Sequence, residues 1–141
     1  METRSKRAKR EMTTDERNFF LYITSKIRED QDFEEYEITT QEIKEILGHS
    51  DRYGRINELI SQIERLIQKV SERVVTIKTQ DIYREPFFSF IRYQHEIRYK
   101  NKEKQEEIII EYKPDIHIAS HLLILKACKE ITMEDIDRII E

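Results

Sequence analysis

The sequence predicts an α+β fold in which helices come first and an antiparallel β-sheet follows. The apolar residues of segment 56–70 follow the period of an α-helix and share one face. Directly afterwards, Val75 and Ile77 alternate with Thr76 and Lys78, which is the two-residue period of a strand. A shorter helical pattern and a tight turn precede the long helix. This order predicts a winged helix-turn-helix with a three-helix core and an antiparallel β wing.

The first helix is expected to begin just after residue 12. Thr13 or Thr14 can cap it, and acidic residues in its first turn complement the positive end of the helix dipole. The helix is expected to end near Glu29, before an acidic loop. Its apolar residues lie at helical spacing, which marks a buried face: Phe19, Phe20, Ile23 and Ile27.

The helix-turn-helix follows a short strand expected at Tyr36 and Ile38. The second helix is predicted over 41–47, with Thr40 as its cap. Gly48 supplies the positive φ that commonly ends a helix. The third helix is expected to run to about residue 71, and two residues can cap it: Ser50 and Asp51.

Strand-like alternation dominates the chain after residue 73. Phe88 and Phe90 are expected on one face of a strand, and Phe87 on the other. Segment 100–106 is polar and strongly charged, which suits the exposed tip of a long hairpin. Three segments are predicted as strands: 74–80, 87–99 and 107–113.

Two helical segments are predicted near the C-terminus. Pro114 ends the last strand, and a short buried helix is expected over 116–127. Thr132 is expected to cap a final segment over 133–140. We therefore divide the chain into a basic flexible arm, a winged-helix domain, and a C-terminal helical segment or start of a linker to a second domain: 1–12, 13–128 and 129–141.

The composition indicates an element-rich domain without a membrane span. The chain has 141 residues, of which 38% are charged, and only two glycines and two prolines. No apolar run approaches the roughly 20 residues that cross a bilayer, and the basic N-terminus lacks the apolar segment of a secretory signal. A single cysteine, Cys128, cannot form an internal disulfide. These features favour a cytoplasmic protein.

Charge is distributed unevenly, although the net charge is −4. Residues 1–11 carry a net charge of +3, and so do residues 48–106. The acidic excess lies in residues 12–47 and 107–141. Basic charge therefore concentrates in the arm, the helix-turn-helix junction and the wing, which are the parts that contact DNA in such folds.

Two clusters are candidates for DNA contact. The start of the third helix offers side chains for guanine and phosphate, and alternate cations at the wing tip are expected to share a face and to follow a phosphate backbone. The alternatives are a polar helix end packed on a sheet and a solvated hairpin tip. The predicted contacts are Ser50, Arg52, Tyr53, Arg55, Arg98, Lys100, Lys102 and Lys104.

A rival function is self-association without direct DNA contact. Aromatic residues of the wing strand would then lie at a dimer interface: Phe87, Phe88, Phe90 and Tyr93. Metal binding is not expected. His117 and His121 are four residues apart, but Cys128 is the one further candidate ligand, so a structural role is favoured. The sequence contains no phosphate-binding glycine loop or nucleophile motif, so we expect a non-enzymatic protein without a cofactor.

The chain resembles the N-terminal winged-helix domain of plasmid replication initiators of the Rep (RepB-type) family. The resemblance covers about residues 12–125 and is one of order, spacing and residue class. The matching segments are MTTDERNFFLYITSKI, YEITTQEIKEILG, RINELISQIERLIQKVSERVVTI, IYREPFFSFIRYQHE and EEIIIEYKPDI.

This resemblance implies binding to plasmid origin repeats and recruitment of host replication proteins. It also implies that a second winged-helix domain reads much of the origin sequence, while the first dimerises and contacts the DNA backbone. A homodimer is therefore expected. A winged-helix transcriptional regulator stays an alternative, because both functions require the same DNA-reading parts.

Overall fold

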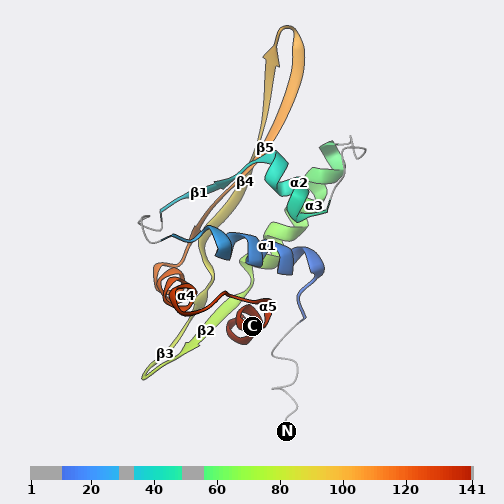
Figure 1. Cartoon of the computed structure of the whole chain (residues 1–141). Helices are drawn as coiled ribbons and strands as arrows, with labels where there is room; N and C mark the ends of the chain where they lie inside the picture. The colour runs from blue at the N-terminus through green and yellow to red at the C-terminus, as the bar shows by residue number, and fades with distance from the viewer. Residues whose placement is uncertain (1–10, 29–33, 49–55, 141) are drawn as a thin grey trace.

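The computed structural model describes residues 11–28, 34–48 and 56–140 (Figure 1). Five helices and five strands lie within these ranges. In chain order they are α1 (Thr14–Lys26), β1 (Tyr36–Ile38), α2 (Thr40–Ile46), α3 (Ile56–Ser71), β2 (Val74–Lys78), β3 (Ile82–Pro86), β4 (Phe88–Lys100), β5 (Glu103–Pro114), α4 (Ile116–Cys128) and α5 (Met133–Ile139).

The strands form two antiparallel sheets. The first has the order β1-β5-β4, and the second pairs β2 with β3. Helices α1, α2 and α3 pack beside the first sheet, and the long β4–β5 hairpin extends beyond them (Figure 1). This arrangement confirms the predicted winged helix-turn-helix, with the β4–β5 hairpin in the place of the wing.

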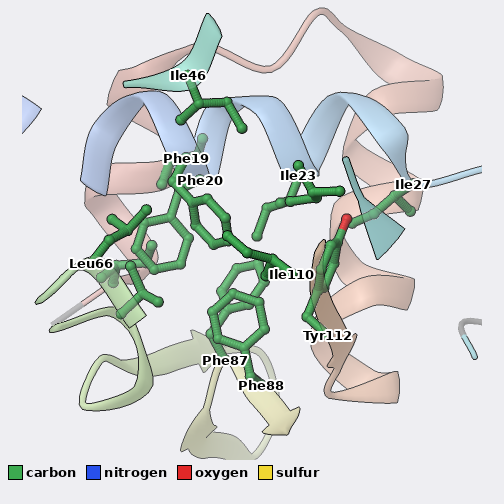
Figure 2. Close-up of a cluster of buried hydrophobic side chains, with 14 of the residues drawn as sticks. Phe19, Phe20, Ile23, Ile27, Ile46, Leu66, Phe87, Phe88, Ile110 and Tyr112 are labelled. Carbon is green, nitrogen blue, oxygen red and sulfur yellow. The ribbon is translucent and has the colours of Figure 1, made fainter. Parts of the chain in front are cut away.

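The core is built around aromatic rings from α1 and from the start of β4 (Figure 2). Phe20 lies 5.0 Å from Phe87 between ring centroids, and Phe19 lies 6.1 Å from Phe88. The apolar stripe of α3 is buried against the same cluster, as its period predicts. Ile136 and Ile140 are also buried there, so α5 packs onto this core.

Helix α2 begins one residue earlier than predicted. Thr39, rather than Thr40, is its cap, and it forms a capping box with Glu42. Thr40 instead bonds to β5. Its hydroxyl donates to the Ile108 carbonyl at 2.8 Å and accepts from the Ile108 N–H at 2.7 Å. The backbone pairing of β1 with β5 ends at Ile38. The side chain of Thr40 makes the next contact with β5, and it holds the start of α2 against the sheet.

The β4–β5 hairpin is longer than predicted. Its paired register continues to Lys100 and Glu103, so only Asn101 and Lys102 form the turn. Both residues have positive φ, as a two-residue hairpin turn requires. The predicted loop over 100–106 is therefore mostly strand.

The structure differs from the predicted strands in two further respects, both in the segment from β2 to the start of β4. Strand β3 was not predicted, because four of its five residues are exposed and its sequence shows little alternation of apolar and polar residues. Phe87 and Phe88 were expected on opposite faces, yet both are buried. Phe87 precedes β4, which begins at Phe88, so strand alternation does not determine the direction of its ring.

Candidate nucleic-acid interface

The helix-turn-helix end of the candidate interface is described only in part. Ser50, Arg52, Tyr53 and Arg55 lie outside the described residues. The described start of α3 is Ile56, which is partly buried against the core. The described part of α3 contacts β4 of the hairpin through Glu64 and Tyr93.

Tyr93 fixes the hairpin on α3. Its hydroxyl donates to the Glu64 carboxylate at 3.0 Å, and this hydrogen bond, with burial, raises the pKa of Tyr93. Residues that pair across two antiparallel strands share a face, and faces alternate along each strand. The face that carries Tyr93 is therefore the α3-facing side, and it continues through Ile97 and Tyr99 toward the tip.

The four predicted wing cations do not share one face, which corrects the expectation from their spacing. Arg98 and Lys100 pair with Gln105 and Glu103 and lie on the outer face. Lys104 pairs with Tyr99 and lies on the α3-facing side. Lys102 occupies the turn. The tip therefore presents cations on both faces rather than in one row.

Carboxylates on the hairpin neutralise part of this charge. Arg98 contacts Glu96 at 2.6 Å, and Lys104 lies 3.8 Å from Glu106. For Lys100 and Lys102, the described part of the chain shows no ion pair. These two lysines are consequently the cations of the tip best placed to meet phosphate.

The structure shows an apolar patch on the hairpin that was not predicted from the sequence. Ile97 is 49% exposed and Tyr99 is 73% exposed, and both lie on the α3-facing side. Apolar residues that alternate with polar ones, as here, are typical of a strand with one buried face. The hairpin extends past the helices that would cover this face, which the sequence does not reveal (Figure 1).

The predicted dimer surface needs one correction. Phe87 is 1% exposed and Phe88 is 7% exposed, so their rings stabilise the chain's own core and cannot contact a second copy in this fold. Phe90 is half-buried, with Arg92 stacked 4.8 Å above its ring, and Tyr93 is half-buried against α3. Phe90 and Tyr93 remain candidates for a dimer contact.

His117 and His121 lie where α4 meets the second sheet. The His117 ring is 5.0 Å from Tyr83, whose hydroxyl donates to Asp115 at 2.7 Å. Burial, together with this carboxylate, raises the pKa of Tyr83 to about 12. Cys128 is exposed at the end of α4. Among the described residues, no three histidine, cysteine or acidic side chains are grouped as metal ligands.

None of the helices in the described ranges combines the length and the apolar composition required to cross a membrane.

Comparison with known protein families shows a match over almost the whole chain. A family model described as "Initiator Replication protein, WH1" matches residues 4–137, which is nearly the whole chain. No curated protein and no solved structure matches the sequence significantly. The match spans the helix-turn-helix, both sheets and most of α5.

Proposed function

Because the chain belongs to the initiator replication protein family, as its WH1 winged-helix domain, we propose that it binds duplex DNA at a plasmid origin. The observation that carries this proposal is the position of the β4–β5 hairpin, which extends beyond the helix-turn-helix with Lys100 and Lys102 at its tip. In this arrangement, the start of α3 meets a groove and the tip meets the adjacent phosphates.

The expected binding is weak and strongly dependent on salt. The hairpin carries as many carboxylates as cations between Glu96 and Glu107, so few phosphates are neutralised. Each phosphate contact contributes about −0.9 to the slope of log K against log salt. Titration of a duplex that contains origin repeats, followed by fluorescence anisotropy over a salt series, is expected to give a slope of roughly −2 to −5. A binding constant that does not change with salt would contradict phosphate contact.

Self-association is a second proposed activity, and the exposed Ile97 and Tyr99 favour it. Apolar side chains on a projecting hairpin are a common means of contact between copies. Phe90 and Tyr93 lie on the same strand. We expect sedimentation to show a dimer at micromolar concentration and a monomer after Ile97→Ser/Tyr99→Ser. A wild-type protein that sediments as a monomer at high micromolar concentration would exclude this surface as a dimer interface.

The proposed action is binding and assembly, without a catalytic step or a cofactor. This role implies a cytoplasmic location. It also implies host replication proteins as further partners.

A further inference from the structure

Two residues of the helix-turn-helix form hydrogen bonds with the β4–β5 hairpin, one on each of its strands. On β5, the hydroxyl of Thr40 donates to the Ile108 carbonyl at 2.8 Å and accepts from the Ile108 N–H at 2.7 Å. On β4, the hydroxyl of Tyr93 donates to the Glu64 carboxylate of α3 at 3.0 Å. The three side chains Thr40, Glu64 and Tyr93 are named here the hairpin clamp.

Both contacts lie at the same level of the hairpin. In the register of the two strands, Tyr93 pairs with Ile110, and Ile108 pairs with His95. The α3 contact and the α2 contact are therefore two residues apart along the hairpin. The pairing of β5 with β1 also ends at this level, at Ile110. The helix-turn-helix thus holds both strands of the hairpin at one place.

Beyond this level, the hairpin projects away from the rest of the chain (Figure 1). Among the residues that the structure describes, the hydrogen bonds and ion pairs of segment 96–106 stay within the hairpin. The distance from His95 to Lys100 is about 17 Å, at about 3.3 Å per residue. A tilt of about 10° at the clamp would move Lys100 by about 3 Å over this length, which is about the length of a hydrogen bond to phosphate. The position of the tip therefore depends on the angle that is set at the hairpin clamp.

The Tyr93–Glu64 hydrogen bond joins the two elements that are proposed to contact DNA. Glu64 lies on α3, whose start is the proposed groove contact, and Tyr93 lies on the strand that carries Lys100. The ring of Tyr93 is half-buried against the core, whereas Glu64 is exposed. Packing therefore holds the ring in place, and the hydroxyl group adds a directional contact to α3.

We propose that the hairpin clamp orients the β4–β5 hairpin relative to α3, and that Tyr93 thereby determines which phosphates Lys100 and Lys102 reach. Glu64 acts together with Tyr93. Neither side chain has to contact DNA itself, so both are positioning residues. The proposal rests on the proposed DNA binding, but the orientation of the hairpin can be measured without DNA.

The orientation is tested first, in the full chain without DNA. Spin labels are attached to Cys128, which is exposed on α4, and to a second cysteine introduced near the tip by Gln105→Cys. Double electron–electron resonance measures the distribution of distances between them. Tyr93→Phe is expected to broaden this distribution, because it removes the hydroxyl and keeps the ring. The matched control is Tyr83→Phe, which removes a tyrosine hydroxyl bonded to Asp115 and is expected to leave the distribution unchanged.

A pair of variants at Glu64 separates the hydrogen bond from the charge. Glu64→Gln and Glu64→Ala remove the same negative charge, but glutamine keeps an oxygen that can accept from Tyr93. Glu64→Ala is expected to broaden the distance distribution as much as Tyr93→Phe does. Glu64→Gln is expected to keep a distribution close to that of the wild type.

Duplex binding is then measured by anisotropy over a salt series in chains without labels. Tyr93→Phe is expected to weaken binding by about two- to tenfold, the range that corresponds to one hydrogen bond. This substitution changes no charge, so a smaller salt dependence would report displaced cations at the tip. Lys100→Gln/Lys102→Gln is therefore expected to lose less affinity in the Tyr93→Phe background than in the wild type. Tyr83→Phe is expected to bind as the wild type does.

The two measurements distinguish failure of the clamp from failure of DNA binding. A distance distribution that stays unchanged in Tyr93→Phe and in Glu64→Ala would overturn the orienting role. A broader distribution without any loss of duplex affinity would also contradict the proposal, because the orientation would then not serve DNA contact. If the wild type binds no duplex, the proposed DNA function fails and the role in reaching phosphates is overturned with it. The distance distributions would still decide whether the clamp orients the hairpin.

Discussion

Replacing Arg73 with methionine is expected to lower the free energy of unfolding by about 3–5 kcal/mol. Arg73 Nε donates to Glu16 Oε1 at 2.9 Å, and Nη2 donates to Glu16 Oε2 at 3.3 Å. Both residues are buried. The substitution leaves the carboxylate of Glu16 in the interior without its cation, and that uncompensated charge is the source of the cost.

Arg73 also connects segments that are distant in the sequence. Its Nη2 donates to the Glu11 carbonyl at 3.1 Å, and its own carbonyl accepts from the Phe87 N–H at 3.2 Å. The residue therefore links the start of α1, the end of α3 and the entry to β4. Denaturant unfolding followed by circular dichroism measures the effect.

The double variant Glu16→Met/Arg73→Met is the matched control. It removes both charges and keeps apolar volume, so it is expected to recover most of the stability lost in Arg73→Met. A single variant that costs under about 1 kcal/mol, or a double variant no more stable than the single one, would contradict this role of the ion pair.

The ion pair also predicts a pH dependence. Burial alone would raise the pKa of Glu16, but hydrogen bonds from Arg73 and the Thr13 backbone, together with the Arg73 charge, outweigh it and hold the pKa below its usual 4.5. The stability that this lowered pKa contributes is present above pH 4.5 and is lost as the pH falls through the folded-state value. In Arg73→Met, burial acts without the cation, so the contribution of Glu16 is expected to reverse sign and to favour the folded state at low pH.

Replacing Phe20 with alanine is also expected to cost about 3–5 kcal/mol. Phe20 is fully buried and lies between aromatic partners, with ring centroids 5.0 Å from Phe87 and 6.0 Å from Phe88 (Figure 2). Removing this ring leaves a cavity at the centre of the cluster, because α1, β4 and β5 hold its walls in place.

The neighbouring residue provides the control for Phe20. Leu21 is on the same turn of α1 but is 40% exposed. Leu21→Ala is therefore expected to cost well under half as much in the same unfolding experiment. If the two variants lost similar free energies of unfolding, the effect would come from helix α1 in general, and the predicted role of the aromatic cluster would be contradicted.

Periodicity predicted the helices well, because their apolar faces are determined by local spacing. The buried residues of α3, Leu59, Ile63, Leu66 and Val70, all belong to the predicted stripe. Where two neighbouring residues are equally suited to cap a helix, the sequence alone does not determine which one does so. Thr39 and Thr40 can both cap α2, and only the contact of Thr40 with β5 decides which one does.

The candidate site was less predictable because strand register is a tertiary property. The cations of the wing tip are visible in the sequence, but their distribution over two faces follows from the pairing of Lys100 with Glu103. The same pairing brings Lys104 near Glu106 and leaves Tyr99 exposed. The burial of both Phe87 and Phe88 likewise depends on where β4 begins, which no alternation pattern encodes.

The salt dependence of duplex binding, compared between the wild type and Lys100→Gln/Lys102→Gln, tests the proposed DNA contact most directly. The double variant is expected to bind more weakly and to reduce the slope of log K against log salt by about 2, since two phosphate contacts are lost. Lys69→Gln/Lys78→Gln removes the same charge away from the hairpin tip and is expected to keep the wild-type slope. Equal slopes for all three proteins would contradict DNA binding through the β4–β5 hairpin.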